Sequence, residues 1–257
     1  MNRLQILADK VVYQAFKLLN HGDKILTDLD VKLYRKRWWG IAPQSGDRPV
    51  CKFWWSEKIE VVLTSVEKTE GIGGDIVELG AYKGGGTLLI AEKLQHLRSR
   101  RQVWALDSFQ GYPTPTECDR MDNGTFHYAK GHHGDTSAQF VQKVLKLYEA
   151  DSYVNICEGF FEEIVPAVFA DVRQFSLIIV DCNHYASTKF CLEFFYERLQ
   201  PNGIVIIDDY RRLEQPYHPE APGVKKAVDE FLVDKPEQLQ HGAYSMWYFV
   251  KSCITSA

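Results

Sequence analysis

The sequence predicts an α/β fold with a doubly wound, mostly parallel, Rossmann-like sheet and an N-terminal helical extension. Two apolar runs carry much of this prediction, since residues 177–180 and 204–207 are unbroken branched aliphatics followed directly by aspartate. Strands without polar alternation are typical of parallel sheets that helices cover on both faces. Five strand-and-helix units also follow one another between residues 75 and 232. Such alternation is typical of a doubly wound sheet.

Residues 1–56 are expected to form a helical, aromatic-rich extension, and residues 57–257 the main domain. Apolar residues recur at helical spacing from Leu4 to about Leu33, and two pairs of tryptophans follow. An amphipathic helix must bury its apolar face. The segment could therefore pack on the main domain, cover the site as a lid, or form the interface of a homo-oligomer.

The remaining elements follow from periodicity and turn residues. Each expected helix has apolar residues three and four apart, and each expected strand is a short apolar run. Glycine and proline separate them, as at residues 71–74 and 201–203. We expect helices over 57–69, 88–97, 138–149, 187–199 and 223–232, and one more that begins at residue 162. We expect strands over 75–79, 103–107, 153–158, 177–180, 203–207 and 244–250.

A glycine-rich loop joins the first strand to the next helix. Glycines at 80, 84, 85 and 86 let the backbone approach a ligand, and the helix N-terminus offers free N–H groups. The spacing departs from the G-x-G-x-x-G of dinucleotide-binding proteins and from the P-loop. Glu78, just before the loop, would repel a pyrophosphate but suits an amine or a ribose hydroxyl. The ligand we expect is therefore S-adenosylmethionine.

Asp107 ends the second strand, where an acid usually binds the ribose diol. The turn-rich stretch that follows, 114–135, is long for a compact domain, and such loops are often functional covers. It contains His132 and His133, which suggest a metal site, although the carboxylates at the later strand ends are the stronger candidates.

Three aspartates lie at the ends of two strands: Asp181, Asp208 and Asp209. Ligands of open α/β sheets bind at these carboxyl ends. Crowded carboxylates need a compensating cation, and a site of oxygen ligands favours Mg²⁺. Neighbouring strand residues face opposite ways, so Asp208 and Asp209 reach one ion only where the strand has turned. The alternative is that these aspartates form turns or helix caps.

Composition excludes several classes of protein. The 257 residues are 45% hydrophobic and 25% charged, with a net charge of −4 and a pI near 6.1, which argues against broad nucleic-acid binding. Short basic runs at 32–37 and 98–101 are interpreted as solvated helix faces or ends. The six cysteines show no zinc spacing and are expected to be reduced thiols. No apolar run is long enough to span a membrane and no secretory signal is evident, so we expect a cytoplasmic protein.

Several motifs in this order resemble the macrocin O-methyltransferase family, over roughly residues 75–232. Members are class I S-adenosylmethionine-dependent methyltransferases, typically Mg²⁺-dependent, that methylate sugar hydroxyls of antibiotics. The motifs are Val77-Glu78-Leu79-Gly80-Ala81-Tyr82-Lys83-Gly84-Gly85, Trp104-Ala105-Leu106-Asp107-Ser108-Phe109-Gln110-Gly111, Gly159-Phe160-Phe161, Val180-Asp181 with Tyr185, Ser187 and Thr188, and Leu199-x-Pro201-x-Gly203 with Ile206-Ile207-Asp208-Asp209-Tyr210.

The resemblance implies roles for individual residues. Glu78 and Gly80 would line the methionine end of the cofactor, Asp107 and Ser108 would hold its ribose, and the three aspartates would bind the metal. The full set of expected cofactor-binding residues is Glu78, Gly80, Tyr82, Gly84, Asp107, Ser108, Gly159 and Asp181, and the expected metal ligands are Asp181, Asp208 and Asp209.

One position departs from the family pattern. The family usually has a carboxylate two residues after the first metal-binding aspartate, and it looks like the general base. Here Asn183 occupies that position, and an amide is not a useful proton acceptor. His184 is the substitute base we name, beside Asp181 and Asn183 in the expected catalytic group. The alternatives are that another base replaces the acid, that the metal suffices without a base, that the chemistry has changed or been lost, or that His184 is structural.

The sequence therefore predicts an S-adenosylmethionine-dependent, Mg²⁺-dependent O-methyltransferase. Its acceptor would be a small hydroxylated molecule, such as a sugar of a natural product, with no nucleic-acid or membrane partner. One alternative is a non-catalytic cofactor-binding or interaction module, which Asn183 favours and the three aspartates disfavour. Another is a nicotinamide-linked oxidoreductase, which the missing dinucleotide fingerprint disfavours.

Overall fold

A computed structural model of the chain describes residues 56–171, 173–211 and 221–253. The extension expected over residues 1–56 lies outside this part except for Ser56, so its predicted roles as lid or interface stay predictions. The helices are α3 (Ser56–Lys68), α4 (Gly85–Leu97), α5 (Ala138–Leu147), α6 (Phe161–Val168), α7 (Tyr185–Tyr196) and α8 (Pro222–Leu232), with short 3₁₀ turns at Glu117–Asp119 and Asp151–Tyr153. The strands are β1 (Asp75–Leu79), β2 (Val103–Asp107), β3 (Val154–Glu158), β4 (Phe175–Val180), β5 (Leu199–Ile207), β6 (Gln240–Ala243) and β7 (Met246–Val250).

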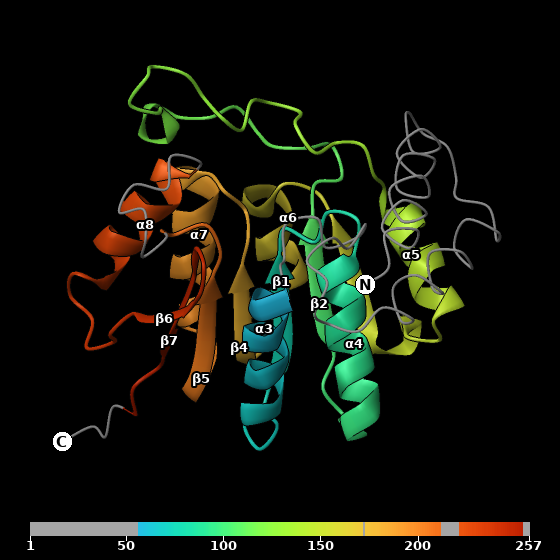
Figure 1. The fold of residues 1–257 in the computed structure, drawn as a ribbon. Helices are drawn as coiled ribbons and strands as arrows, with labels where there is room; N and C mark the ends of the chain where they lie inside the picture. The colour runs from blue at the N-terminus through green and yellow to red at the C-terminus, as the bar shows by residue number, and fades with distance from the viewer. Residues whose placement is uncertain (1–55, 172, 212–220, 254–257) are drawn as a thin grey trace, which may run out of the picture.

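The strands form one seven-stranded sheet in the order β3-β2-β1-β4-β5-β7-β6 (Figure 1). The first five strands pair in parallel, and β7 and β6 complete the sheet as an antiparallel hairpin. The predicted doubly wound, mostly parallel sheet is confirmed. The strand order reverses between β1 and β4, and a crevice for ligands opens at such a point.

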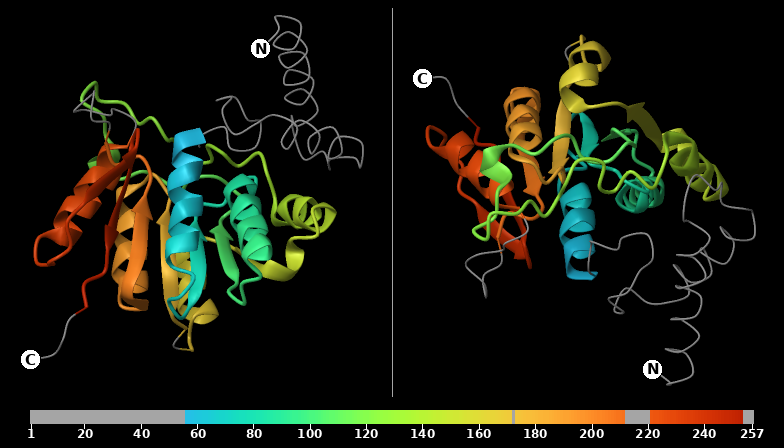
Figure 2. Two further views of the ribbon diagram at one scale, coloured as in Figure 1. Left: turned by 60° about the horizontal axis from the view of Figure 1, so that its bottom comes forward. Right: turned by 90° about the horizontal axis from the view of Figure 1, so that it is seen from above.

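Helices cover both faces of the sheet, as Figure 2 shows. Apolar side chains of α3, α4 and α5 pack on one face, and those of α6, α7 and α8 pack on the other. All six residues of β4 are buried. The unbroken apolar run at 177–180 predicted this for the last four, and Ser176 is buried with them. No helix in the described ranges is both long and apolar enough to cross a membrane.

The hairpin at the end of the chain was only half predicted. The expected strand over 244–250 corresponds to β7, but β6 precedes it, and Tyr244 in the turn has a φ of 51°. The sequence Gln-His-Gly-Ala of β6 has no apolar alternation, so its backbone pairing with β7 determines its conformation. Edge pairing of this kind leaves little trace in side-chain pattern.

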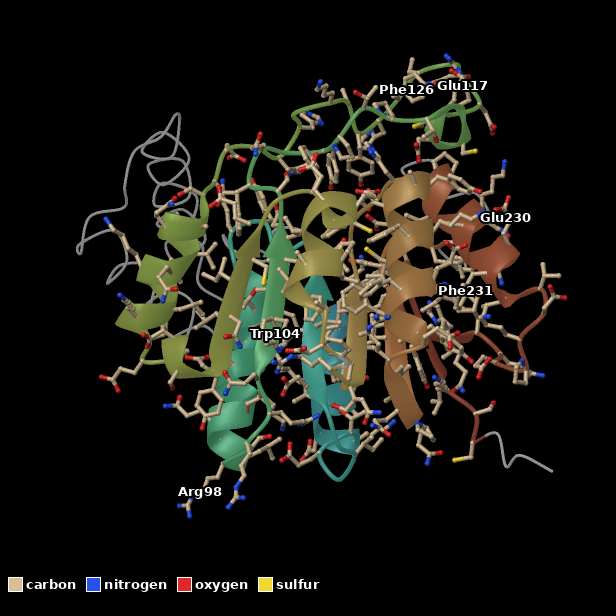
Figure 3. The ribbon with its side chains drawn as sticks, turned by 180° about the vertical axis from the view of Figure 1, so that it is seen from behind. Arg98, Trp104, Glu117, Phe126, Glu230 and Phe231 are labelled. Carbon is tan, nitrogen blue, oxygen red and sulfur yellow. The ribbon has the colours of Figure 1, made fainter. Side chains whose placement is uncertain are left out.

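The basic run at 98–101 contains one correction to the sequence analysis. Arg98 is exposed, as expected, and points away from the body of the protein (Figure 3). Arg101 is instead 7% exposed. Its guanidinium donates to the Val66 carbonyl at 2.7 Å and to the Thr69 hydroxyl at 2.9 Å, and it pairs with Glu70. Arg101 therefore ties the C-terminal end of α3 to the sheet, because only a long planar cation can satisfy several acceptors together.

We expect Arg101→Met to lower the free energy of unfolding by about 3 kcal/mol, because it leaves buried acceptors without their donor. Arg100→Met is the matched control, since Arg100 is exposed, and it should change stability by less than about 0.5 kcal/mol. Urea unfolding followed by circular dichroism measures both. Equal stability of the two variants would show that the Arg101 contacts contribute little.

Candidate functional site

A cavity opens at the carboxyl ends of the parallel strands, where the strand order reverses. Residues from the ends of the five parallel strands and from the loop after β2 line it. Six of the eight residues predicted to bind the cofactor are among them, namely Gly80, Tyr82, Asp107, Ser108, Gly159 and Asp181. The structure thus brings together side chains that are up to about a hundred residues apart in the sequence.

Close backbone packing forms the floor of the cavity. Gly80 has a φ of 105°, and a Cβ there would lie 2.0 Å from the carbonyl oxygen of Asp181. Only glycine allows the loop after β1 to pass β4 at this distance. Gly84, at the end of the loop, does not line the cavity, but a Cβ there would lie 2.6 Å from Cγ1 of Val141. Its role in this structure is to let α4 begin against α5.

Asp107 presents a carboxylate that the backbone holds in place. Oδ2 accepts the N–H of Tyr82 at 2.8 Å, and Oδ1 accepts the N–H of Phe109 at 2.7 Å. Burial raises the pKa of Asp107, while the two backbone donors oppose that shift. Each oxygen keeps a lone pair beyond these bonds, so the carboxylate can accept two hydroxyl groups of a ligand.

Glu78 lies beneath the glycine-rich loop and does not line the cavity. It is 2% exposed, and the hydroxyl of Thr87 donates to its carboxyl group. Burial raises the pKa of Glu78 to about 8. A carboxyl group with this pKa is mostly protonated at neutral pH, so a positive ligand would be needed to ionise it.

The long loop after β2 lies across the carboxyl edge of the sheet (Figure 1). Its aromatic rings gather over the cavity: the centroid of Tyr112 lies 5.1 Å from that of Tyr128 and 5.4 Å from that of His133. The Tyr82 hydroxyl donates to Asp135 at 2.6 Å, which ties the cover to the glycine-rich loop. The sequence analysis expected a cover here, but it did not identify Tyr112 and Tyr128 as part of the site.

The two residues after Asp181 and Cys182 differ in their access to the cavity. Asn183 lines it, has a φ of 56° and donates its amide N–H to the Tyr112 hydroxyl at 2.6 Å. His184 does not line it and is 2% exposed. Nε2 of His184 lies 2.8 Å from the carbonyl oxygen of Tyr128, which can only accept, so Nε2 carries the proton. His184 therefore holds the covering loop in place.

The three predicted metal ligands are not equivalent. Asp181 and Asp209 line the cavity, whereas Asp208 lies below it and is 2% exposed. Asp209 has a φ of 54°, so the strand has turned and both neighbouring carboxylates reach one cation. That cation is the ammonium of Lys58, 2.5 Å from Oδ1 of Asp208 and 3.6 Å from Oδ1 of Asp209.

Lys58 is a site residue that the sequence analysis missed. It lies in the first turn of α3 and is 4% exposed. Burial lowers the pKa of Lys58, because it disfavours the charged ammonium. The negative charges of the two aspartates outweigh this effect, so the pKa of Lys58 is raised. A lysine at the start of a helix is ordinary in sequence, so no local signal marks it. Within the described ranges, no group of three or more His, Cys, Asp or Glu residues is arranged to hold a metal ion.

Comparison with known proteins links this chain to enzymes that methylate oxygen. The family model for macrocin-O-methyltransferase (TylF) matches residues 56–235. The chain is 32% identical over 167 residues to mycinamicin III 3''-O-methyltransferase from Micromonospora griseorubida, covering 63% of this chain and 61% of that protein. It is 29% identical over 180 residues to demethyldecarbamoylnovobiocin O-methyltransferase from Streptomyces niveus, covering 68% and 65%. The matches therefore span less than two thirds of these relatives' length.

Solved structures share the fold. The O-methyltransferase NovP has a TM-score of 0.70 at 24% identity, covering 88% of this chain and 99% of that one. The calicheamicin methyltransferase CalS11 has a TM-score of 0.64 at 19% identity, covering 95% and 92%. TomG from Streptomyces achromogenes, solved in complex with SAM, has a TM-score of 0.51 at 13% identity, covering 89% and 92%. These similarities place the seven-stranded sheet among the folds of methyltransferases.

Proposed function

This chain belongs to the macrocin-O-methyltransferase family, and on that premise we propose that it transfers a methyl group from S-adenosylmethionine to a hydroxyl oxygen. The observation that carries the proposal is the cavity at the strand-order reversal, where six of the eight predicted cofactor-binding residues meet. Bound S-adenosylmethionine supplies an electrophilic methyl group on its sulfonium. The protein's own contribution is to hold the acceptor in line, exclude water and accept a proton.

The residues of the cavity fit this cofactor. Asp107 has two oxygens available to a ribose diol. Gly80 has no side chain, so the backbone itself lines the cavity at this position. Asp181 at the cavity wall offers negative charge to an ammonium or sulfonium, and Glu78 beneath the loop would add to it once a cationic ligand favours its ionised form. None of these features suits a pyrophosphate, which disfavours the nicotinamide-linked alternative.

We propose a sugar hydroxyl on a small natural product as the acceptor. Relatives are named for such substrates, including mycinamicin III and a rhamnosyl tetracenomycin. The rings of Tyr112, Tyr128 and His133 supply flat apolar faces with polar edges above the cavity. A sugar presents C–H faces and hydroxyl edges in the same way, so this surface suits it.

A histidine of the covering loop is our proposed general base. The sequence analysis named His184, whose ring is buried and held by the Tyr128 carbonyl outside the main cavity. His133 lines that cavity together with Asp181 and Asn183. An imidazole in contact with the acceptor can take its proton near neutral pH. We therefore favour His133 over His184.

The predicted Mg²⁺ fits the described residues only in part. Asp181 and Asp209 face the cavity, but Oδ1 of Asp208 is already bonded to the Lys58 ammonium. A divalent ion held by all three carboxylates would have to displace that lysine. Mg²⁺ dependence therefore stays a prediction from the sequence, and the proposed transfer uses only side chains of the protein.

The non-catalytic alternative rests on Asn183, whose amide donates to Tyr112 and accepts no proton. Calorimetric titration with S-adenosylmethionine, S-adenosylhomocysteine and NAD⁺ is the first test. We expect micromolar binding of the first two and none of the third, followed by methyl transfer in a screen of glycosylated acceptors. Binding without transfer to any acceptor would favour the alternative, and absence of binding would contradict the proposed function.

Cofactor affinity should rise with pH between about 5.5 and 7.5. Ligand-free Glu78 keeps its proton up to a pKa of about 8, and a cationic ligand favours the carboxylate. Binding then releases a proton, so affinity increases as pH rises, by up to about tenfold per unit. Calorimetry in buffers of different ionisation enthalpy measures the release.

Glu78→Gln should flatten that dependence, whereas Glu193→Gln, an exposed control, should leave it intact. A pH dependence that persists unchanged in Glu78→Gln would place the released proton on another group.

We expect His133→Ala to lower kcat by about 100-fold, because the acceptor loses its base, while the affinity for S-adenosylmethionine stays within twofold. His127→Ala, an exposed residue outside the cavity, is the control. If folded His184→Ala shows this loss instead, the original assignment of the base is the right one.

A further inference from the structure

Lys58 reaches the acidic end of β5 from a helix 150 residues earlier in the chain. The helix α3 packs on one face of the sheet, with Ile59 and Val62, which follow Lys58 on the helix, in the core. Figure 2 shows this helix lying along the sheet beside α4. The lysine side chain is therefore directed to the carboxyl edge by core packing.

The ammonium occupies the space between two carboxylates. It lies 2.5 Å from Oδ1 of Asp208 and 3.6 Å from Oδ1 of Asp209, and the side chains of Lys58 and Asp208 are 4% and 1% exposed. The backbone N–H of Asp209 also donates to Oδ1 of Asp208 at 2.8 Å, and the hydroxyl of Ser245 donates to Oδ1 of Asp209 at 2.9 Å. Both carboxylates are thus held in one arrangement around one positive group.

We infer that Lys58 is the resident cation of the Asp208–Asp209 pair and takes the position predicted for a divalent ion. In this arrangement Lys58 is a positioning residue. It donates a hydrogen bond to Asp208 and attracts Asp209 at the cavity wall through charge, without a metal. Only the expected effect of Lys58 on turnover rests on the proposed function. The cation site is seen in the contacts of the chain itself, whatever its activity.

Charge distinguishes this arrangement from a metal site. Lys58 with Asp208 and Asp209 carries a formal charge of +1 − 2 = −1, whereas a divalent ion on the same pair would give zero. The cavity wall therefore keeps a negative charge beside Asp181, which favours a sulfonium and a neutral acceptor over a phosphorylated one.

Because Lys58 occupies the position predicted for the divalent ion, methyl transfer by the wild type should need no added divalent ion and should tolerate EDTA.

Titration with Mn²⁺, followed by electron paramagnetic resonance and calorimetry on the full chain without cofactor or acceptor, tests the inference. If the lysine must leave before the metal can bind, only the molecules whose lysine has already left can bind it. The apparent metal affinity is then the intrinsic affinity multiplied by the fraction of those molecules. We expect Lys58→Ala to bind Mn²⁺ at least about 100-fold more tightly than the wild type. Lys58→Ala/Asp208→Asn should lose that gain, and Lys93→Ala, which removes a partly exposed ion-paired lysine of α4, should not show it.

Equal Mn²⁺ affinity in the wild type and Lys58→Ala would overturn the inference, and so would no binding by a folded Lys58→Ala. Should Lys58→Ala fail to fold, micromolar Mn²⁺ binding by the wild type would still overturn it, and Lys58→Met provides a variant of similar size. Failure of the proposed function is distinguishable, because it appears in the cofactor titration and not in these metal titrations.

Discussion

The contact between the Gly80 backbone and the Asp181 carbonyl is the constraint on which the site depends. With a separation that excludes any Cβ, the loop after β1 crosses directly over the end of β4. This approach brings the glycine-rich loop, the Asp107 carboxylate and the acidic ends of β4 and β5 around one cavity. A wider separation would leave the same residues on two unconnected surfaces.

Burial gives each acidic group of the site a different character. Glu78 and Asp107 have raised pKa values because they are removed from water, and only Asp107 has backbone donors that oppose the shift. Asp208 is as buried as Glu78 but has a lysine beside it. A buried carboxyl group either keeps its proton or acquires a cation. Glu78 and Asp208 show these two solutions within one site.

The fold was largely predictable from the sequence, because buried strands and amphipathic helices leave local patterns. The strand-end aspartates and the glycine-rich loop followed from the same logic, since parallel strands place their ends at one edge. Contacts across the chain left no such pattern. Arg101 and Lys58 both read as ordinary basic residues, and their burial depends on how α3 packs against the sheet. Likewise, the sequence indicated the covering loop and its histidine pair, but not that Tyr112 and Tyr128 would lie beside His133 at the cavity.

Asn183 and Lys58 have related consequences for the chemistry. A divalent ion lowers the pKa of a bound hydroxyl strongly, and a carboxylate at position 183 would then need to be only a weak base. An ammonium polarises the acceptor less, and Asn183 takes no proton. Under the proposed arrangement, deprotonation therefore depends on a stronger base. The covering loop brings two histidines to the cavity, His132 and His133, and His133 is the base that we propose. The substitution at 183 and the lysine at the acidic pair thus transfer this task from the strand ends to the covering loop.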